Sequence, residues 1–203
     1  GMFWKFPADF TADSSAGIRP RSAYLKVIGD FTRWNDRLVF GCDDSALKGF
    51  LNARKAKANF PGPGQSNSNL WFTSLTKPDE LGPATATGSV WDKDPVKAGE
   101  YSEPFLFSGW DYRMAWVKND SSHSVSFAFE VDKKGNNQWT PLREIKVEAG
   151  ESVHILFDKE ALGEWIRVKT DVPTLATVSF TYTDSDERST TSDEIFEGLA
   201  ELD

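Results

Sequence analysis

Residues 124–131, SVSFAFEV, decide the fold class of this chain. Val125, Phe127, Phe129 and Val131 alternate strictly with small or polar residues, and a period of two puts all four on one face of a β-strand. A strand with one apolar and one polar face is typical of an antiparallel sheet that covers a core on one side only. We therefore expect an all-β protein.

The segments after this strand repeat the pattern. A polar turn, DKKGNN, ends the strand and predicts a hairpin. Alternating segments separated by turn residues recur over residues 139–147, 152–157, 165–169 and 176–183. Five or six such strands predict a two-sheet β-sandwich of the jelly-roll or immunoglobulin-like kind.

The N-terminal half has a looser rhythm. Residues 23–46 predict two strands around Trp34-Asn35-Asp36, and residues 68–91 repeat the order of strand, polar turn and strand. Their offset, about 45 residues, matches one blade of a β-propeller. Helical periodicity occurs near 44–57 and again after the capping box Thr191–Glu194, so each place predicts a short helix.

These patterns divide the chain into three parts. Residues 1–95 are expected to form blade-like hairpins with one short helix, and residues 96–183 the β-sandwich domain. Residues 184–203 are an acidic tail that contains the second short amphipathic helix. This helix would bury its apolar stripe on its own domain or in the groove of a partner.

Charge argues against several classes of partner. The chain of 203 residues has a formal net charge of −8, and the tail holds eight acidic residues against Arg188, so the remainder is close to neutral. A body without a basic surface is not expected to bind nucleic acid or anionic lipid. No stretch approaches the roughly 20 apolar residues of a membrane span, so no membrane insertion is expected.

Catalytic and metal-binding motifs are scarce. The chain has two histidines, His123 and His154, and one cysteine, Cys42. Their spacing in the sequence is not that of a zinc site. Cys42 is expected to be a small buried side chain at a strand end, and His154 a solvated strand residue. No Gly-x-Ser-x-Gly elbow or phosphate-binding loop occurs, so no catalytic residue is assigned and no cofactor is expected.

Calcium is the one weak candidate for a bound ion. Asp132, Asn136 and Asn137 cluster in the hairpin turn, and residues 43–44 and 184–186 also offer paired oxygens. Each group is smaller than a full calcium ligand set, and ordinary use in turns and caps explains it as well.

Aromatic residues supply the candidate binding site. The chain has 8 Trp, 15 Phe and 4 Tyr. Sugars stack on exposed aromatic rings while nearby polar groups bind their hydroxyls. Trp165 is the best candidate, because alternation points it outward together with Arg167 and Lys169, and Trp110 and Trp139 are expected to join it. The competing interpretation is that these tryptophans pack against the rim of the sandwich or a neighbouring domain.

Residues 29–46 (GDFTRWNDRLVFGCDDSA), 68–83 (SNLWFTSLTKPDELGP) and the segment from 103–117 (EPFLFSGWDYRMAWV) to 163–171 (GEWIRVKTD) carry a resemblance. The chain resembles, over about residues 20–183, the C-terminal portion of large bacterial proteins in which sialidase-like or kelch-like propeller blades run into a β-sandwich. The resemblance implies a periplasmic or extracellular location and no catalytic motif. Two blade-like units are fewer than the four or more that close a propeller.

The first functional hypothesis is a non-catalytic β-sandwich module of a bacterial envelope or secreted protein, which binds carbohydrate or a protein partner through aromatic residues. The alternative is the C-terminal fragment of a β-propeller carbohydrate-active enzyme whose catalytic residues lie outside this chain. A glycosidase needs only two carboxylates at a set separation, which sequence spacing does not show. A third hypothesis is a spacer or assembly surface, and the oligomeric state is left open.

Overall fold

The computed structural model describes residues 2–23, 27–43 and 68–186. These residues form β-strands and one short 3₁₀ turn, η2 (Lys77–Asp79). Within these ranges there is no helix with the length and hydropathy that a membrane span requires. The helices expected near 44–57 and after Thr191 fall outside the described residues.

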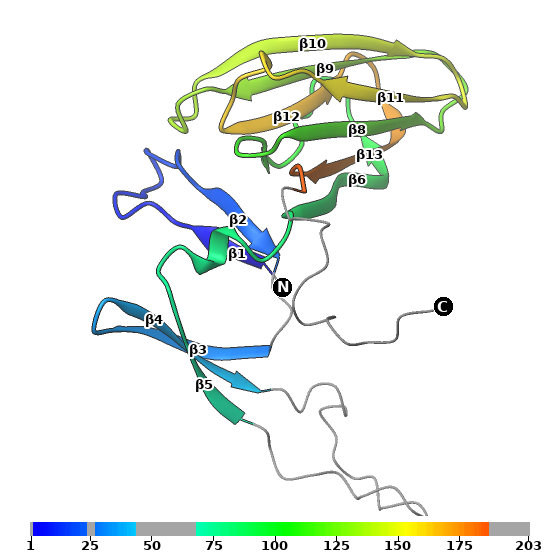
Figure 1. Cartoon of the computed structure of the whole chain (residues 1–203). Coiled ribbons are helices and arrows are strands. Elements are labelled where there is room, and N and C mark those ends of the chain that lie inside the picture. Colours follow the sequence, from blue (N-terminus) through cyan, green and yellow to red (C-terminus); the bar gives the residue numbers. More distant parts are fainter. Residues whose placement is uncertain (1, 24–26, 44–67, 187–203) are drawn as a thin grey trace, which may run out of the picture.

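Eight antiparallel strands form the sandwich expected from the sequence, in two layers that lie face to face (Figure 1). This is more than the five or six expected, because no strand was predicted over residues 105–119 and the strand predicted before residue 91 was assigned to a blade-like hairpin. The strands are β6 (Thr85–Val96), β7 (Phe105–Leu106), β8 (Tyr112–Asn119), β9 (Val125–Asp132), β10 (Trp139–Val147), β11 (Ser152–Phe157), β12 (Trp165–Thr170) and β13 (Thr174–Thr183).

The strand order identifies the sandwich as a jelly roll. One sheet has the order β10-β9-β12-β7 and the other β11-β8-β13-β6. Counted from β6 as strand one, these orders are 5-4-7-2 and 6-3-8-1, which is the arrangement of two interleaved Greek keys. Of the two kinds of sandwich expected, the structure is therefore the jelly roll.

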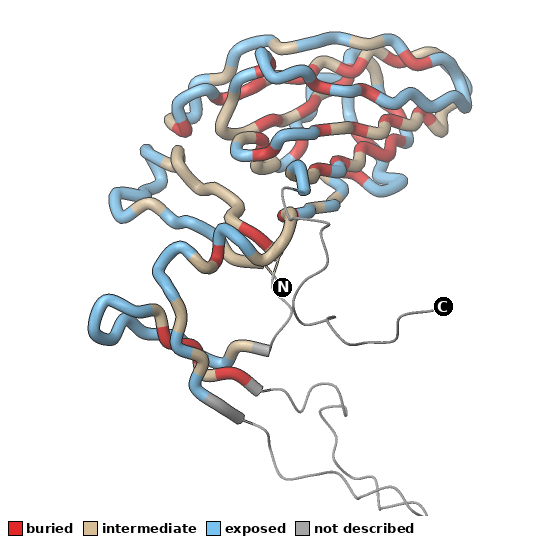
Figure 2. The backbone as a smooth tube through the Cα atoms, viewed as in Figure 1, coloured by how far each residue is buried: buried red, intermediate tan, exposed pale blue. Residues whose placement is uncertain are grey.

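The core lies between these two sheets, where the alternation of β9 and β13 places it. Buried positions alternate with half-buried ones along β9, and Figure 2 shows the buried positions gathered between the two layers. The ring centroid of Phe129 lies 6.1 Å from that of Phe157 and 6.5 Å from that of Phe180, so the rings bridge the two sheets. The four apolar side chains of residues 124–131 are at most 1% exposed: Val125, Phe127, Phe129 and Val131.

Strand β6 shows why part of the sandwich was missed. It pairs with β13, whereas the sequence analysis assigned Thr85–Val96 almost entirely to the N-terminal part. Its positions that face the core include the small residues Ala86 and Gly88, because the ring of Phe105 fills the space between the sheets at this point. A Cβ on Gly88 would lie only 2.8 Å from Phe105 Cε2. The alternation of β6 also breaks at Trp91, which is buried directly after the half-buried Val90, where the register with β13 shifts. The sequence therefore shows no regular apolar stripe.

The N-terminal half forms two smaller sheets. Strands β1 (Met2–Lys5) and β2 (Arg19–Ala23) form a ribbon, and β3 (Val27–Trp34), β4 (Arg37–Asp43) and β5 (Ser68–Thr73) form a three-stranded sheet. The expected hairpin turn between β3 and β4 is confirmed. Its Asn35 and Asp36 have φ of 46° and 59°, which is the conformation of a tight two-residue hairpin turn.

The prediction of a second blade-like unit over residues 68–91 is wrong. Its first strand, β5, pairs with β4, while its second, β6, belongs to the sandwich. The rhythm of strand, turn and strand was present, but the two strands pair with different neighbours, and pairing is set by tertiary contacts. A propeller blade has four strands, and the described residues place three in this sheet.

The β1–β2 ribbon lies between the sandwich and the three-stranded sheet (Figure 1). Phe3 packs on Phe40 of the three-stranded sheet, with ring centroids 5.3 Å apart. On the other side, Trp4 meets Trp110 of the sandwich edge to face, with centroids 6.0 Å apart. The β1–β2 loop, residues 6–18, continues along the sandwich.

Candidate functional site

Four of the five candidate residues lie on the outward side of the sheet β10-β9-β12-β7. Trp165, Arg167 and Lys169 alternate on β12 with the buried Ile166 and Val168. Trp139 begins β10, and both Trp139 and Trp165 are paired with Asp132 of β9 across the sheet. The outward direction expected for Trp165, Arg167 and Lys169 is confirmed.

Arg167 is the centre of this group. Its guanidinium carbon lies 3.6 Å from the ring centroid of Tyr101 and 4.3 Å from that of Trp139, so the cation stacks on two aromatic rings. Its Nη2 and Nε donate hydrogen bonds of 2.6 and 3.0 Å to Glu130 Oε2. Tyr101 and Glu130 were not among the sequence candidates.

Glu130 joins Arg167 to Lys169. Lys169 Nζ lies 3.1 Å from Glu130 Oε1 and donates a 3.0 Å hydrogen bond to the hydroxyl of Tyr101. Burial of the Glu130 carboxylate, whose side chain is 12% exposed, favours its neutral form, but the hydrogen bonds from the two cations outweigh burial and hold its pKa below the ordinary value. The bonds from Lys169 to Tyr101 and Glu130 raise the pKa of Lys169.

We call Tyr101, Glu130, Trp139, Trp165, Arg167 and Lys169 the aromatic face. Three of its members are charged at neutral pH and three are aromatic, and they come from β9, β10, β12 and the segment before β7. Each charged side chain has a partner within the face, and two aromatic rings flank Arg167, so these contacts favour one arrangement of the side chains. Such preorganisation reduces the entropy cost of binding.

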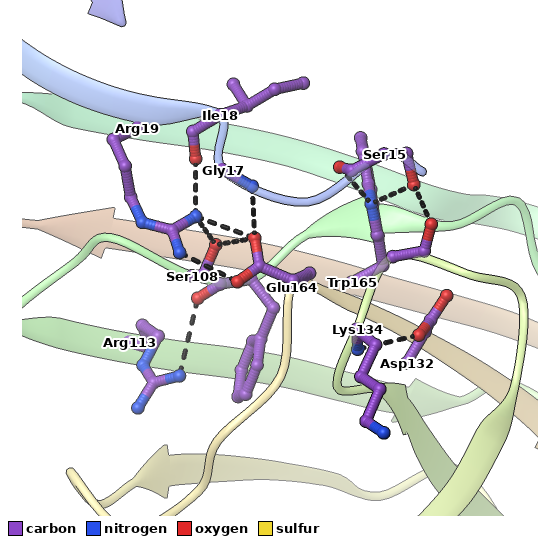
Figure 3. Close-up of polar contacts among 12 residues, drawn as sticks. Ser15, Gly17, Ile18, Arg19, Ser108, Arg113, Asp132, Lys134, Glu164 and Trp165 are labelled. Atoms are coloured by element: carbon purple, nitrogen blue, oxygen red, sulfur yellow. Dashed lines mark hydrogen bonds and ion pairs between the residues drawn. The ribbon is translucent and has the colours of Figure 1, made fainter. Parts of the chain in front are cut away.

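Trp165 is less exposed than the alternation suggested, because the β1–β2 loop lies across it. Its indole Nε1 donates to the carbonyl oxygen of Ser15 at 3.1 Å and to Ser15 Oγ at 2.9 Å (Figure 3). Trp165 and Trp139 line a hollow of about 310 Å³, which Ser15, Pro104 and Asn137 help to enclose. The competing interpretation is therefore correct in part for Trp165, since one edge of its ring is packed.

Trp110 is not part of the aromatic face, so its assignment to the site is wrong. It is 7% exposed and packs on Tyr182 of β13, with ring centroids 5.7 Å apart, and on Trp4. Trp110 precedes β8 in a loop, where alternation does not predict direction, and β1 covers it from a part of the chain distant in sequence. Its ring packs on Tyr182 and Trp4 and does not join the rings of the aromatic face.

Asp132 and its turn, the best of the calcium candidates, are occupied by backbone contacts. Asp132 accepts hydrogen bonds from the backbone N–H groups of Lys134, at 3.0 Å, and Asn137, at 2.6 Å. Across residues 2–23, 27–43 and 68–186, His, Cys, Asp and Glu side chains form no group of three or more that could hold a metal ion. The calcium hypothesis rests on the sequence alone.

Two other expectations from the sequence agree with the structure. Cys42 is 2% exposed near the end of β4, as expected for a small buried side chain. His154 lies exposed on β11, in register with Trp116 of β8.

The missed residues could be found only through strand pairing. Glu130 lies opposite Arg167 because β9 and β12 are neighbours in this register. Tyr101 comes beside Lys169 through an isolated bridge outside the regular strands. The outward position of Glu130 was visible from alternation, but no sequence signal pointed to its partner.

Comparisons with known proteins give no family. No protein-family model matches the chain, and no curated protein matches it. Solved structures resemble parts of it: the PBSX exported protein XepA (15% identity, TM-score 0.37), a protein of Bacillus endospore appendages, which form disulfide-linked pili (14%, 0.31), and a structure described as CBM4 (9%, 0.23). They cover 58%, 51% and 78% of this chain and 43%, 86% and 78% of theirs.

The chain thus spans less than half the length of XepA, at 43%. With TM-scores below 0.5, these similarities support no functional assignment.

Proposed function

We propose that this protein is a non-catalytic β-sandwich module that binds carbohydrate on the aromatic face. The observation that supports the proposal is the stack of Tyr101, Arg167 and Trp139 on the outward side of the sandwich, with Trp165 beside it. Apolar ring surface next to charged hydrogen-bonding groups is the combination that recognises a sugar, which has apolar C–H faces and a rim of hydroxyls.

The polar groups suit hydroxyl recognition. Lys169 and Glu130 offer a donor and an acceptor within 3.1 Å of each other, and the side chain of Lys169 is 34% exposed. Tyr101 is 42% exposed, so part of its ring is open to a ligand. A protein partner could use the same rings, and the experiment below separates the two ligand classes.

The test measures binding of soluble polysaccharides and a glycan array to the full chain and to Trp139→Ala and Tyr101→Ala. We expect each variant to weaken binding at least about tenfold, because aromatic anchors near the centre of a site carry most of the binding energy. Tyr112→Ala is the matched control, since Tyr112 is 59% exposed on β8 of the opposite sheet.

A second variant tests the stacked geometry itself. Arg167→Lys keeps the positive charge but removes the planar group that stacks on Tyr101 and Trp139, so it should weaken glycan binding as well. The carbohydrate proposal would be refuted if no glycan bound to the chain. It would also be refuted if glycan binding survived both Trp139→Ala and Tyr101→Ala. Capture of a defined protein that depends on Trp139, without glycan binding, would assign the face to a protein partner instead.

A further inference from the structure

A second, larger hollow lies next to the aromatic face. It has a volume of about 570 Å³ and lies among β2, the loop before β8 and the loop between β11 and β12. Glu164 lines this hollow and Trp165 lines the smaller one, so the two hollows flank consecutive residues. A volume of this size suits a small ligand such as a monosaccharide.

The charge of this hollow is opposite to that of the chain. Four cationic side chains line it, whereas the carboxylates in its lining are Asp111 and Glu164. The whole chain has a net charge of −8. We call this region the basic hollow; its cations are Arg19, Arg113, Lys133 and Lys159.

The two carboxylates are already held. Arg19 forms a two-pronged contact with Glu164, with Nη1 and Nη2 each 2.7 Å from a carboxylate oxygen (Figure 3). Asp111 Oδ2 accepts the backbone N–H of Ser185 at 2.9 Å, which holds the pKa of Asp111 below its ordinary value. Once Arg19 and Glu164 offset each other, three cations face one carboxylate.

Arg113 is the cation that the fold holds most tightly. It is 7% exposed, and its hydrogen-bond acceptors are the carbonyl oxygens of Phe107, Ala161 and Asp158, at 3.4, 2.9 and 2.8 Å. These neutral groups accept hydrogen bonds from its two Nη atoms, and its guanidinium carbon lies 4.1 Å from the ring centroid of Phe107. Within the described ranges Arg113 forms no ion pair. Burial lowers the pKa of Arg113, and a buried charge of this kind favours an anionic partner.

Among the described residues, two that line the hollow also have buried N–H donors without an acceptor. Trp110 Nε1 and Arg113 Nε have no hydrogen-bond partner in the part of the chain that the structure describes. Both side chains line the basic hollow, and both are 7% exposed. Most buried polar groups in folded proteins are hydrogen-bonded, so these two donors leave hydrogen-bonding capacity unused in residues that line the hollow. Within the described chain, the hydroxyl of Tyr182, whose ring packs on Trp110, is a third such atom and belongs to a residue outside the lining.

Lys133 and Lys159 complete the site from the solvent side. Both are exposed and line the hollow, and in residues 2–23, 27–43 and 68–186 neither forms an ion pair. We infer that the basic hollow is a binding site for an oxyanion group, a carboxylate or a sulfate, carried by a small polar ligand such as an acidic sugar. Arg113 supplies the fixed charge, and the two lysines attract the ligand. This site is separate from the aromatic face and does not depend on the function proposed there.

The experiment follows the indole N–H signal of Trp110 by NMR while sodium glucuronate, sodium sulfate or neutral methyl glucoside is added to the full chain. Glucuronate, sulfate or both should shift this signal in a saturable way, and added sodium chloride should weaken the effect because it screens the charges. If sulfate alone acts, the oxyanion suffices; if glucuronate alone acts, the sugar ring contributes. Both results support the site.

The lysines give the variant test. Lys133→Gln/Lys159→Gln removes two exposed charges without touching the core and should weaken the effective ligand roughly tenfold. Lys118→Gln/Lys146→Gln removes the same charge elsewhere on the sandwich and is the control, as is Tyr101→Ala, which affects only the aromatic face. No shift with either anion, an equal shift with methyl glucoside, or equal weakening by both lysine pairs would overturn the inference.

Discussion

The jelly-roll sandwich and the β3-β4-β5 sheet are both antiparallel, but among the described residues only the sandwich has a second sheet facing each of its sheets. Its apolar side chains meet between two four-stranded sheets and form one continuous cluster. In the three-stranded sheet, Val39, Phe40 and Cys42 are buried, whereas Phe31 and Trp34 are 66% and 63% exposed. A sheet needs a layer packed on its apolar face to bury the side chains there.

The difference between the two regions affects where a binding site can lie. A layer that is fixed from behind by a core can hold outward side chains in one geometry, and the aromatic face and basic hollow both lie on the sandwich. The three-stranded sheet touches the rest of the described chain through contacts such as Phe3 on Phe40. The Arg21–Asp79 ion pair joins β2 to η2, in the segment between β5 and β6. We expect it to open more easily than the sandwich.

The largest expected effect separates these two regions with one chemical change. Phe180→Ala and Phe40→Ala each remove a phenyl ring that is at most 1% exposed, at a cost of about 3–5 kcal/mol. Phe180→Ala should lower the free energy of unfolding of the whole sandwich. Phe40→Ala should speed amide hydrogen exchange in β3, β4 and β5 and leave β9 and β13 protected. Faster exchange in β9 after Phe40→Ala would show that the two regions unfold as one unit.

A smaller effect is expected where the β1–β2 loop meets the sandwich. Gly135 has a φ of +62°, and a Cβ there would lie 2.3 Å from the backbone nitrogen of Ala16. Gly135→Ala should therefore displace the loop, break the 2.7 Å hydrogen bond from Ser15 N–H to the Gly135 carbonyl, and cost about 1–3 kcal/mol. The indole signal of Trp165 should shift, since it donates to Ser15.

Gly150→Ala is the matched control for this variant. Gly150 has a φ of +75° and no atom within 4 Å of its Cβ position, so it reports backbone strain without a clash. Equal losses of stability in the two variants, with an unchanged Trp165 signal, would mean that the loop does not depend on Gly135.

The smallest expected effect concerns pH. Burial of Glu164 opposes ionisation, but its bonds to Arg19, Gly17 and Ser108 outweigh this and hold its pKa below the ordinary value of 4.5. The unfolded chain therefore takes up the proton first as pH falls. The pair stabilises the fold fully above about pH 4.5 and loses this effect, about 1 kcal/mol, as pH drops through the lowered pKa.

Chemical denaturation between pH 3 and 7 checks this prediction. Glu164→Gln should flatten part of the decline in stability below pH 4.5, and Glu130, whose pKa is also lowered, should account for a further part. An unchanged pH profile in Glu164→Gln would show that the ion pair does not stabilise the attachment of β2 to the sandwich.

Local sequence patterns were enough to predict the fold class and the direction of many side chains. Strict alternation in 124–131 and 165–169 was enough to separate buried from outward residues, because the period of a strand is a local property of the backbone. The tight turn at Asn35–Asp36 was also local, since its residues tolerate positive φ. For these reasons Trp165, Arg167 and Lys169 were correctly expected to point outward from the sandwich.

Which strands pair, and which outward residues meet, depends on tertiary contacts. Strand β6 joined the sandwich through its contact with β13, Glu130 met Arg167 through the register of β9 and β12, and Trp110 was buried by Trp4 from the first strand. The basic hollow likewise combines Arg19, Arg113 and Lys159 from distant parts of the chain. Contacts between residues far apart in sequence depend on the summed packing of the whole fold, and no local pattern encodes them.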